Sequence, residues 1–212
     1  MTFSELAQSH APTLDRLALA IAAEFHDVDE KRALGRLDEL ADELEPGLSP
    51  REEGDALAAL IGGRYGFAGN EAYYDHPDNS MLDLVLERGL GLPILLSVVY
   101  EEVARRRGIP LHGLGLPGHF VVAHFGEDPP LVYDPFAGGE RIELEAPPEL
   151  VRAWRPQETA LRILNNLVAS FGKHGDLMKA IRAAELRLEL PMEVETYTEL
   201  EAELRSYRAR LN

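Results

Sequence analysis

The fold is decided by the segment Gly89-Leu90-Gly91-Leu92-Pro93-Ile94-Leu95-Leu96-Ser97, which continues to Arg107 and turns at Gly108-Ile109-Pro110. Residues 94–99 are almost entirely apolar, which is typical of a helix that is buried on all sides. Pro93 suits the first position of such a helix, because the N–H that proline lacks would have no partner there. We therefore expect a buried helix that begins at Pro93 and ends near Arg107.

Short strand-like segments follow this helix and are separated by Gly and Pro turns. They cover residues 111–116, 120–125, 131–133 and 141–144. A buried helix followed by a run of short strands is typical of the α+β class, with the strands forming an antiparallel sheet. The sequence therefore predicts an α+β fold with a small antiparallel sheet packed on the buried helix.

Helical patterns flank this core on both sides. Leucines recur at three- and four-residue spacing between residues 13 and 44, and Ser49-Pro50-Arg51-Glu52 is a capping box that opens a further helix to about Tyr65. Asn79-Ser80 is expected to cap a helix that runs through Glu87. Helical spacing returns from residue 158 onward. We expect an N-terminal helical region (1–66), a core (67–157) and a C-terminal helical region (158–212).

Four features, in their order along the chain, resemble the transglutaminase-like superfamily, and most closely its SirB-like branch. They are the buried helix, the run Arg105-Arg106-Arg107-Gly108-Ile109-Pro110, the motif Pro117-Gly118-His119-Phe120 and the motif Tyr133-Asp134-Pro135. In that superfamily a Cys opens the buried helix, and a His and an Asp follow on successive strands. The resemblance implies a papain/transglutaminase-like core, with His119 and Asp134 in the places of the family's His and Asp.

The nucleophile of that family is missing from this chain. Counting back fifteen residues from Gly108 puts the nucleophile position at Pro93, and the chain contains no Cys. Ser97 is the only Ser or Thr between Pro93 and Gly108, and it lies about 6 Å of helical rise beyond Pro93. A buried helical serine commonly bonds the carbonyl four residues back, so we expect a structural role for Ser97 and keep nucleophile as the alternative.

We expect His119 and Asp134 to lie together as a base and its orienting carboxylate. Such a pair can activate a water molecule, or it can simply bind a ligand. Pro93, Tyr74, Gly118 and Phe120 are the residues that we expect to line the surrounding cleft. The histidines at positions 112, 119 and 124 lack the spacing of a zinc motif, so no metal or other cofactor is expected.

Composition excludes several classes of protein. The absence of Cys rules out disulfides, thiolate metal sites and thiol catalysis, and fits a reducing compartment. A net charge of -16 disfavours nucleic acid as a partner, because affinity for phosphate backbones comes from cationic contacts. No apolar run approaches the eighteen residues of a membrane span, and the N-terminus has no signal-peptide pattern. We therefore expect a cytoplasmic protein that does not bind membranes.

Three functions remain open. The first is a non-catalytic, regulatory protein, in effect a pseudoenzyme, that holds a peptide or protein partner in the old cleft. The second is a hydrolase of peptide, amide or ester bonds in which His119 and Asp134 activate Ser97 or water. The third is a scaffold whose C-terminal helices, which loosely match one tetratricopeptide unit, dock a partner. The missing nucleophile favours the first.

Overall fold

The computed structural model of the chain describes all residues except 46, 48, 117, 144–146, 148–149 and 211–212. Its α-helices are α1 (Phe3–Ala7), α2 (Leu14–Ala23), α3 (Glu30–Glu43), α4 (Pro50–Ala58), α5 (Leu82–Arg88), α6 (Pro93–Arg106), α7 (Pro156–Lys173), α8 (Leu177–Arg187) and α9 (Val194–Ala209). The strands are β1 (Ala68–Gly69), β2 (Leu90–Gly91), β3 (Leu111–Leu116), β4 (His119–His124), β5 (Leu131–Asp134) and β6 (Glu140–Ile142). A π-helix, η1 (Ala59–Arg64), and two 3-10 helices, η2 (Pro77–Ser80) and η3 (Pro135–Ala137), complete the described elements.

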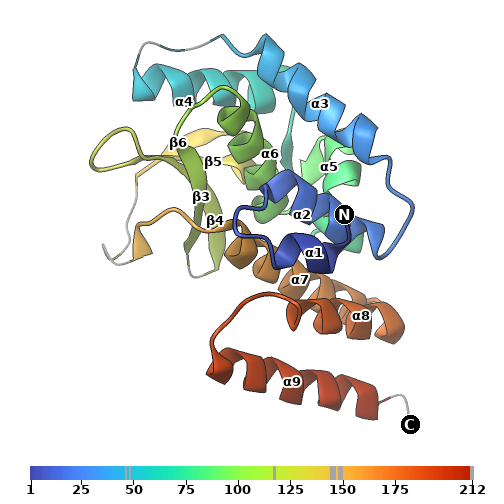
Figure 1. Cartoon of the computed structure of the whole chain (residues 1–212). Coiled ribbons are helices and arrows are strands. Elements are labelled where there is room, and N and C mark those ends of the chain that lie inside the picture. Colours follow the sequence, from blue (N-terminus) through green and yellow to red (C-terminus); the bar gives the residue numbers. More distant parts are fainter. Residues whose placement is uncertain (46, 48, 117, 144–146, 148–149, 211–212) are drawn as a thin grey trace.

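The buried helix of the prediction is α6. Every residue from Pro93 to Ala104 is buried, and Pro93 occupies the first turn. Figure 1 shows α6 at the centre of the molecule, where it packs on β3 and β4 on one side and on α2, α3 and α5 on the other. Because both sides are covered, residues 93–99 of this helix are apolar on every side except at Ser97.

The sheet is a meander of four antiparallel strands in the order β3-β4-β5-β6. Its residues alternate between two faces. Phe120, Val122 and Tyr133 join the main core with α6, whereas Val121 and Val132 belong to a separate apolar cluster on the other face. This arrangement confirms the predicted α+β class.

The predicted strand bounds agree with the structure to within a few residues. β3 is as predicted, and β4 begins one residue early at His119, because His119 pairs with Leu116 across the hairpin. The last strand, predicted to reach Leu144, is described as far as Ile142, and Leu144 lies outside the described residues. The same holds for Pro117 of the histidine motif.

One prediction near the core was wrong. Asn79 and Ser80 do not cap α5, which has Met81 at its N-cap without a side-chain bond. They belong instead to the 3-10 helix η2, and the Asn79 amide turns back onto the preceding loop. The helix that starts at Pro50 changes to a π-helix after Ala58, where Gly62 lies against the Gly138 backbone and leaves no room for a Cβ.

A buried cluster of charges joins α6 to α2. The Arg106 guanidinium donates to Asp15 Oδ2 at 2.7 Å and to Glu102 Oε2 at 2.9 Å, and both carboxylates are almost fully buried. Burial, followed by the charge of Asp15, raises the pKa of Glu102. The Asp15 carboxyl has a lowered pKa, because hydrogen bonds and the Arg106 charge outweigh its burial. The cluster anchors the C-terminal half of α6.

The C-terminal helices lie at one end of the molecule (Figure 1). α7 packs on α2 and pairs with α8 through a tight turn at Gly175, whose φ of 75° suits glycine. α9 packs on α8, and Leu204 is its one buried residue among those described. None of the described helices is long and apolar enough to cross a membrane.

Candidate functional site

His119 and Asp134 lie on neighbouring antiparallel strands, at the start of β4 and the end of β5. Their side chains meet with His119 Nε2 3.0 Å from Asp134 Oδ2. Phe136, two residues further on, lies against Gly69 of β1, which pairs with β2 directly before α6. The pair therefore lies at the end of the sheet nearest the N-terminus of α6, where the resemblance placed it.

The Asp134 carboxylate is held by the turn that follows it. Its Oδ1 accepts from the Phe136 N–H at 2.9 Å, and its backbone carbonyl accepts from the Gly139 N–H at 2.8 Å. With one oxygen on the backbone and the other on the imidazole, Asp134 orients the ring of His119.

The second imidazole nitrogen of His119 is available. Within the described part of the chain, Nδ1 has no hydrogen-bond partner, and the His119 side chain is 35% exposed. An oriented imidazole with one unoccupied nitrogen can accept a proton or a hydrogen bond from a bound group. The pair is thus competent to bind or to act as a base.

Ser97 is not placed to act with this pair. Its side chain has no exposed surface, and its hydroxyl donates to the Pro93 carbonyl oxygen at 2.8 Å. This is the bond expected of a buried helical serine. The first turn of α6, residues 93–96, consists of one Pro and aliphatic residues, so it offers no reactive side chain.

The other predicted lining residues divide into two groups. Tyr74 is 47% exposed and packs edge-on against Phe136, with ring centroids 5.9 Å apart, and Gly118 is exposed with a φ of 75°. Phe120 is buried against Trp154, with centroids 5.2 Å apart, and Pro93 is buried at the start of α6. Only Tyr74 and Gly118 of this set therefore reach the surface beside His119.

Two contributors were missed by sequence reasoning. Arg162 of α7 donates through Nη2 to the His119 carbonyl at 3.2 Å and through Nη1 to the Leu116 carbonyl at 3.4 Å. Asn79 is fully buried, and its amide donates to the carbonyls of Tyr73 and Tyr74 at 2.7 and 3.2 Å. Arg162 thus holds the β3–β4 hairpin at His119, and Asn79 holds the loop of residues 70–76, which we call the tyrosine loop. Helical and strand periodicity indicate neither contact.

A histidine beside a carboxylate is common in this protein and does not by itself mark a site. His26 Nε2 lies 2.7 Å from Asp83 Oδ2, and His124 Nε2 lies 2.8 Å from Glu53 Oε2. His124 is buried and its Nδ1 accepts from the Gly126 N–H, which is a structural arrangement. His119 differs from His124 in its partly exposed side chain, and from both His26 and His124 in its position at the end of the sheet, next to the turn that holds Asp134.

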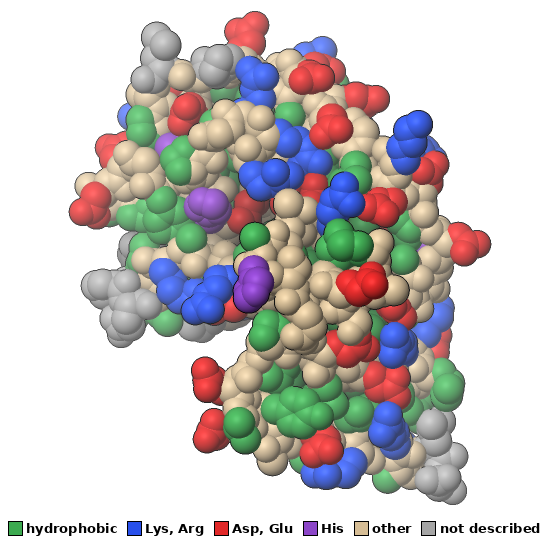
Figure 2. All heavy atoms as spheres, viewed as in Figure 1, with side chains coloured by type: hydrophobic (Ala, Val, Ile, Leu, Met, Phe, Trp, Pro, Cys, Tyr) green, Lys and Arg blue, Asp and Glu red, His purple; other side chains and the backbone are tan. Residues whose placement is uncertain are grey.

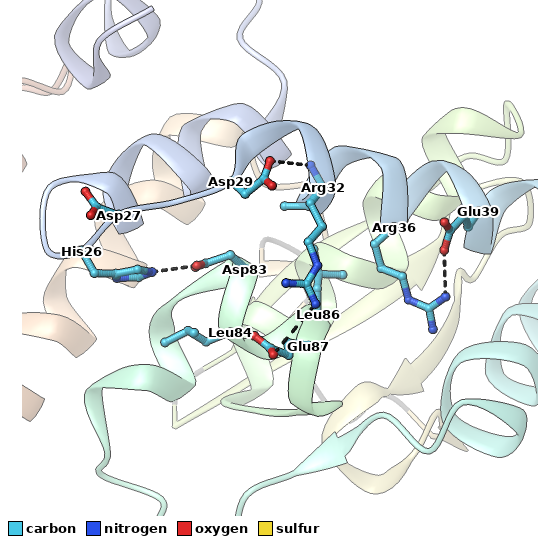
Figure 3. Close-up of a pocket in the computed structure, with 11 residues that line it drawn as sticks. His26, Asp27, Asp29, Arg32, Arg36, Glu39, Asp83, Leu84, Leu86 and Glu87 are labelled. Atoms are coloured by element: carbon cyan, nitrogen blue, oxygen red, sulfur yellow. Dashed lines mark hydrogen bonds and ion pairs between the residues drawn. The ribbon is translucent and has the colours of Figure 1, made fainter.

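Figure 3 shows His26 pointing at Asp83 on the wall of a cavity of about 470 Å³ between α3 and α5. Charged side chains of both signs line this cavity, among them Arg32, which faces Glu87. A second cavity of about 850 Å³ lies beside β5. Neither is lined by His119 or Asp134. Across the described residues, no three His, Asp or Glu side chains are grouped to hold a metal ion.

The chain is similar to known proteins over most of its length. Residues 31–168 match the family model described as Transglutaminase-like superfamily. A UPF0162 protein of Xylella fastidiosa (strain 9a5c) is 39% identical over 145 residues, which are 60% of this chain and 52% of the relative. The UPF0162 protein PA3419 of Pseudomonas aeruginosa is 31% identical over 195 residues, or 84% of this chain and 72% of the relative.

A shorter similarity reaches a eukaryotic protein. F-box only protein 21 of Homo sapiens is 34% identical over 68 residues, which are 32% of this chain and 11% of that protein. The chain spans about half the length of the Xylella relative. No solved structure matches the chain.

Proposed function

The chain belongs to the transglutaminase-like superfamily and to the UPF0162 family, and from this premise we propose that it is a non-catalytic member that binds a peptide or protein partner in a regulatory role. The observation that carries the proposal is the contrast between two parts of the site. The first turn of α6 holds no nucleophile and Ser97 is bonded to Pro93, whereas His119 and Asp134 remain oriented and partly exposed.

The surroundings of this pair suit a peptide. We define the His119–Asp134 surface by five residues: Tyr74, Gly118, His119, Asp134 and Phe136. Tyr73 extends it with a side chain that is 72% exposed. Exposed tyrosines combine apolar area with a hydroxyl and are enriched where proteins bind one another. The hydrogen bonds from Asn79 fix the backbone of both tyrosines, so ordering them costs little on binding.

A protein partner also fits the charge distribution. Figure 2 shows basic and acidic side chains interspersed over the face in view. With a net charge of -16, the chain would repel a phosphate backbone. These features support a protein partner over a nucleic acid. The proposed location of the protein is the cytoplasm.

The finer classification is also a proposal. The order of the motifs supports the SirB-like branch, and the packed pair of α7 and α8 supports one tetratricopeptide-like unit. The division of the chain into three regions, 1–66, 67–157 and 158–212, is likewise proposed. Hydrophobic side chains gather over α8 and α9 in Figure 2. Met178 of α8 and Tyr197 of α9 are exposed. These features favour a second proposed role, in which the C-terminal helices dock a partner.

One observation favours the hydrolase alternative. Asp134 binds Nε2 of His119 and leaves Nδ1 without a partner in the described structure, which is the arrangement of a general base with its orienting carboxylate. In this alternative Nδ1 accepts a proton from water while the water oxygen attacks a bound carbonyl carbon, and the imidazolium then returns that proton to the amine or alcohol that leaves as the scissile bond breaks. No side chain of the first turn of α6 takes part.

A binding experiment tests the proposed function. An octapeptide library is selected on the full chain, and the enriched peptides are measured with the wild type, His119→Ala and His26→Ala. His26 is the matched control, because it also lies beside an aspartate but on the α3/α5 cavity. The proposal expects binding that His119→Ala weakens about tenfold and His26→Ala leaves unchanged. Failure to enrich any peptide, or equal effects of both variants, would contradict it.

A further inference from the structure

We propose that Arg162 sets the ligand class of the His119–Asp134 surface by binding a carboxylate of the partner peptide. This inference rests on the proposed function and adds the chemistry of the recognised group. The carboxylate belongs either to an Asp or Glu side chain or to a free C-terminus, and the two sources share the same planar pair of oxygens. Arginine matches that pair with two parallel N–H donors.

Arg162 is unusual among the described arginines because it is partly buried and has no carboxylate partner. Most of the others form ion pairs, as Arg106 does with Asp15 at 2.7 Å and Arg152 with Glu158 at 2.6 Å. The other arginines that form no ion pair with a described carboxylate are all exposed: Arg107, Arg141, Arg155 and Arg210. Water can solvate those four, whereas Arg162 loses part of its solvation without gaining a counter-charge.

The surroundings of Arg162 leave donors available. A guanidinium has five N–H donors, and the contacts to the carbonyls of Leu116 and His119 occupy two. At 3.4 and 3.2 Å these contacts are at the long end of the hydrogen-bond range, and a carbonyl does not neutralise the charge. The guanidinium carbon lies 5.6 Å from the Phe120 ring centroid and 5.8 Å from that of Trp154, so two aromatic rings flank it.

The position of Arg162 links it to the proposed surface. It contacts the backbone of His119, and the Tyr74 phenol is close enough to act on its charge, although burial is the larger influence and lowers the pKa of Arg162. A carboxylate beside the guanidinium would supply the missing counter-charge. The same carboxylate would lie near the His119 imidazole, whose N–H can donate a hydrogen bond to it.

A purely structural role is the competing account. In it, Arg162 only ties α7 to the β3–β4 hairpin, and any carboxylate preference is absent. Both accounts predict that Arg162→Gln lowers stability, so the melting temperature does not separate them. The composition of the bound peptides does, because it is measured on the unaltered protein.

The test uses one octapeptide library, half synthesised with a free C-terminal carboxylate and half with an amide. Peptides enriched on the wild type are resynthesised with each Asp changed to Asn, each Glu to Gln, and the C-terminus amidated. Their Kd values are measured by fluorescence anisotropy with the wild type, Arg162→Gln, Arg162→Lys and Arg107→Gln. Arg107 is the control, since it carries the same charge on an exposed residue without an ion pair.

We expect one carboxylate in the enriched peptides to be required, so that its amide form binds at least tenfold more weakly to the wild type. Arg162→Gln should lose the same factor and no longer distinguish the two forms, Arg162→Lys should retain part of it, and Arg107→Gln should match the wild type. If an Asp→Asn or Glu→Gln change weakens binding, the bound carboxylate is a side chain of the peptide. If amidation weakens binding, the bound carboxylate is the C-terminus. Enriched peptides without a required carboxylate overturn this inference alone, whereas the absence of any enriched peptide overturns the proposed function with it.

Discussion

The Ser97 hydroxyl donates to the Pro93 carbonyl oxygen at 2.8 Å, inside the helix that would carry the nucleophile of a cysteine enzyme of this superfamily. Both residues are buried. The bond links the only serine or threonine of that helix to the residue that stands in the nucleophile position. This hydrogen bond is expected to stabilise the fold and to keep the Ser97 hydroxyl from acting as a nucleophile, and the two effects can be measured separately.

Ser97→Ala should affect stability and leave partner binding unchanged. We expect the free energy of unfolding to fall by about 1 kcal/mol, the usual contribution of one hydrogen bond. Thr198→Ala removes the same kind of bond, from Oγ1 to the Val194 carbonyl at 2.9 Å, but on the exposed helix α9, and should cost less than about 0.5 kcal/mol. Urea unfolding measures both. A Ser97→Ala protein of normal stability that no longer binds the selected peptides would contradict the structural role.

Arg106→Ala should be the most damaging change of a charged residue near α6. It leaves the buried Asp15 and Glu102 carboxylates with the more exposed Arg105 as their remaining cation, and we expect a loss of about 2 kcal/mol in the free energy of unfolding. Arg107→Ala, one residue further on and exposed, should stay within about 0.5 kcal/mol of the wild type. Equal effects of the two variants in urea unfolding would show that the cluster does not anchor the helix.

His112 should make stability depend on pH. The hydrogen bond that the His112 ring donates to the Glu101 carboxylate, 3.2 Å away, raises the pKa of His112 against the opposing effect of burial. A folded pKa above the unfolded value of about 6.5 adds stability that is complete below that value and is lost as pH rises through the folded pKa. The difference in unfolding free energy between the wild type and His112→Gln should therefore be larger at pH 6 than at pH 9. A difference that grows with pH would contradict the assignment, and Glu101→Gln should abolish the trend.

Asn79→Ala should loosen the tyrosine loop. The Asn79 amide donates to the carbonyls of Tyr73 and Tyr74 and accepts from Asn70 at 2.9 Å, so the variant leaves buried backbone groups without partners. We expect a loss of about 2 kcal/mol in global stability. Amide hydrogen exchange in residues 70–76 should accelerate by more than this global change accounts for. Uniform acceleration across the chain would show that Asn79 has no specific effect on the loop.

The sequence predicted those parts of the fold that local patterns encode. Pro93 and the apolar run after it defined the start of α6, and the Gly and Pro turns defined β3 from Leu111 to Leu116. The resemblance brought His119 and Asp134 together, and the structure places them 3.0 Å apart. In each case the signal lies in residues that are adjacent in sequence or share a motif.

The remainder of the site depends on side-chain contacts that no sequence motif or periodicity indicates. Arg162 is 43 residues from His119, and nothing in the spacing of α7 distinguishes it from other helical arginines. Asn79 was read as a helix cap, because Asn-Ser before an apolar run is typical of one. The 3-10 helix from Pro77 to Ser80 displaces it from that position and turns its amide to the tyrosine loop.

The most direct test of the central claim is mass spectrometry of the selected peptides after long incubation with the wild type and with His119→Ala. The proposed function predicts that every peptide is recovered intact from both proteins, while His119→Ala holds them about tenfold more weakly. Cleavage of a peptide at a defined bond by the wild type, absent with His119→Ala at the same melting temperature, would contradict a binding-only role and establish water activation by His119 and Asp134.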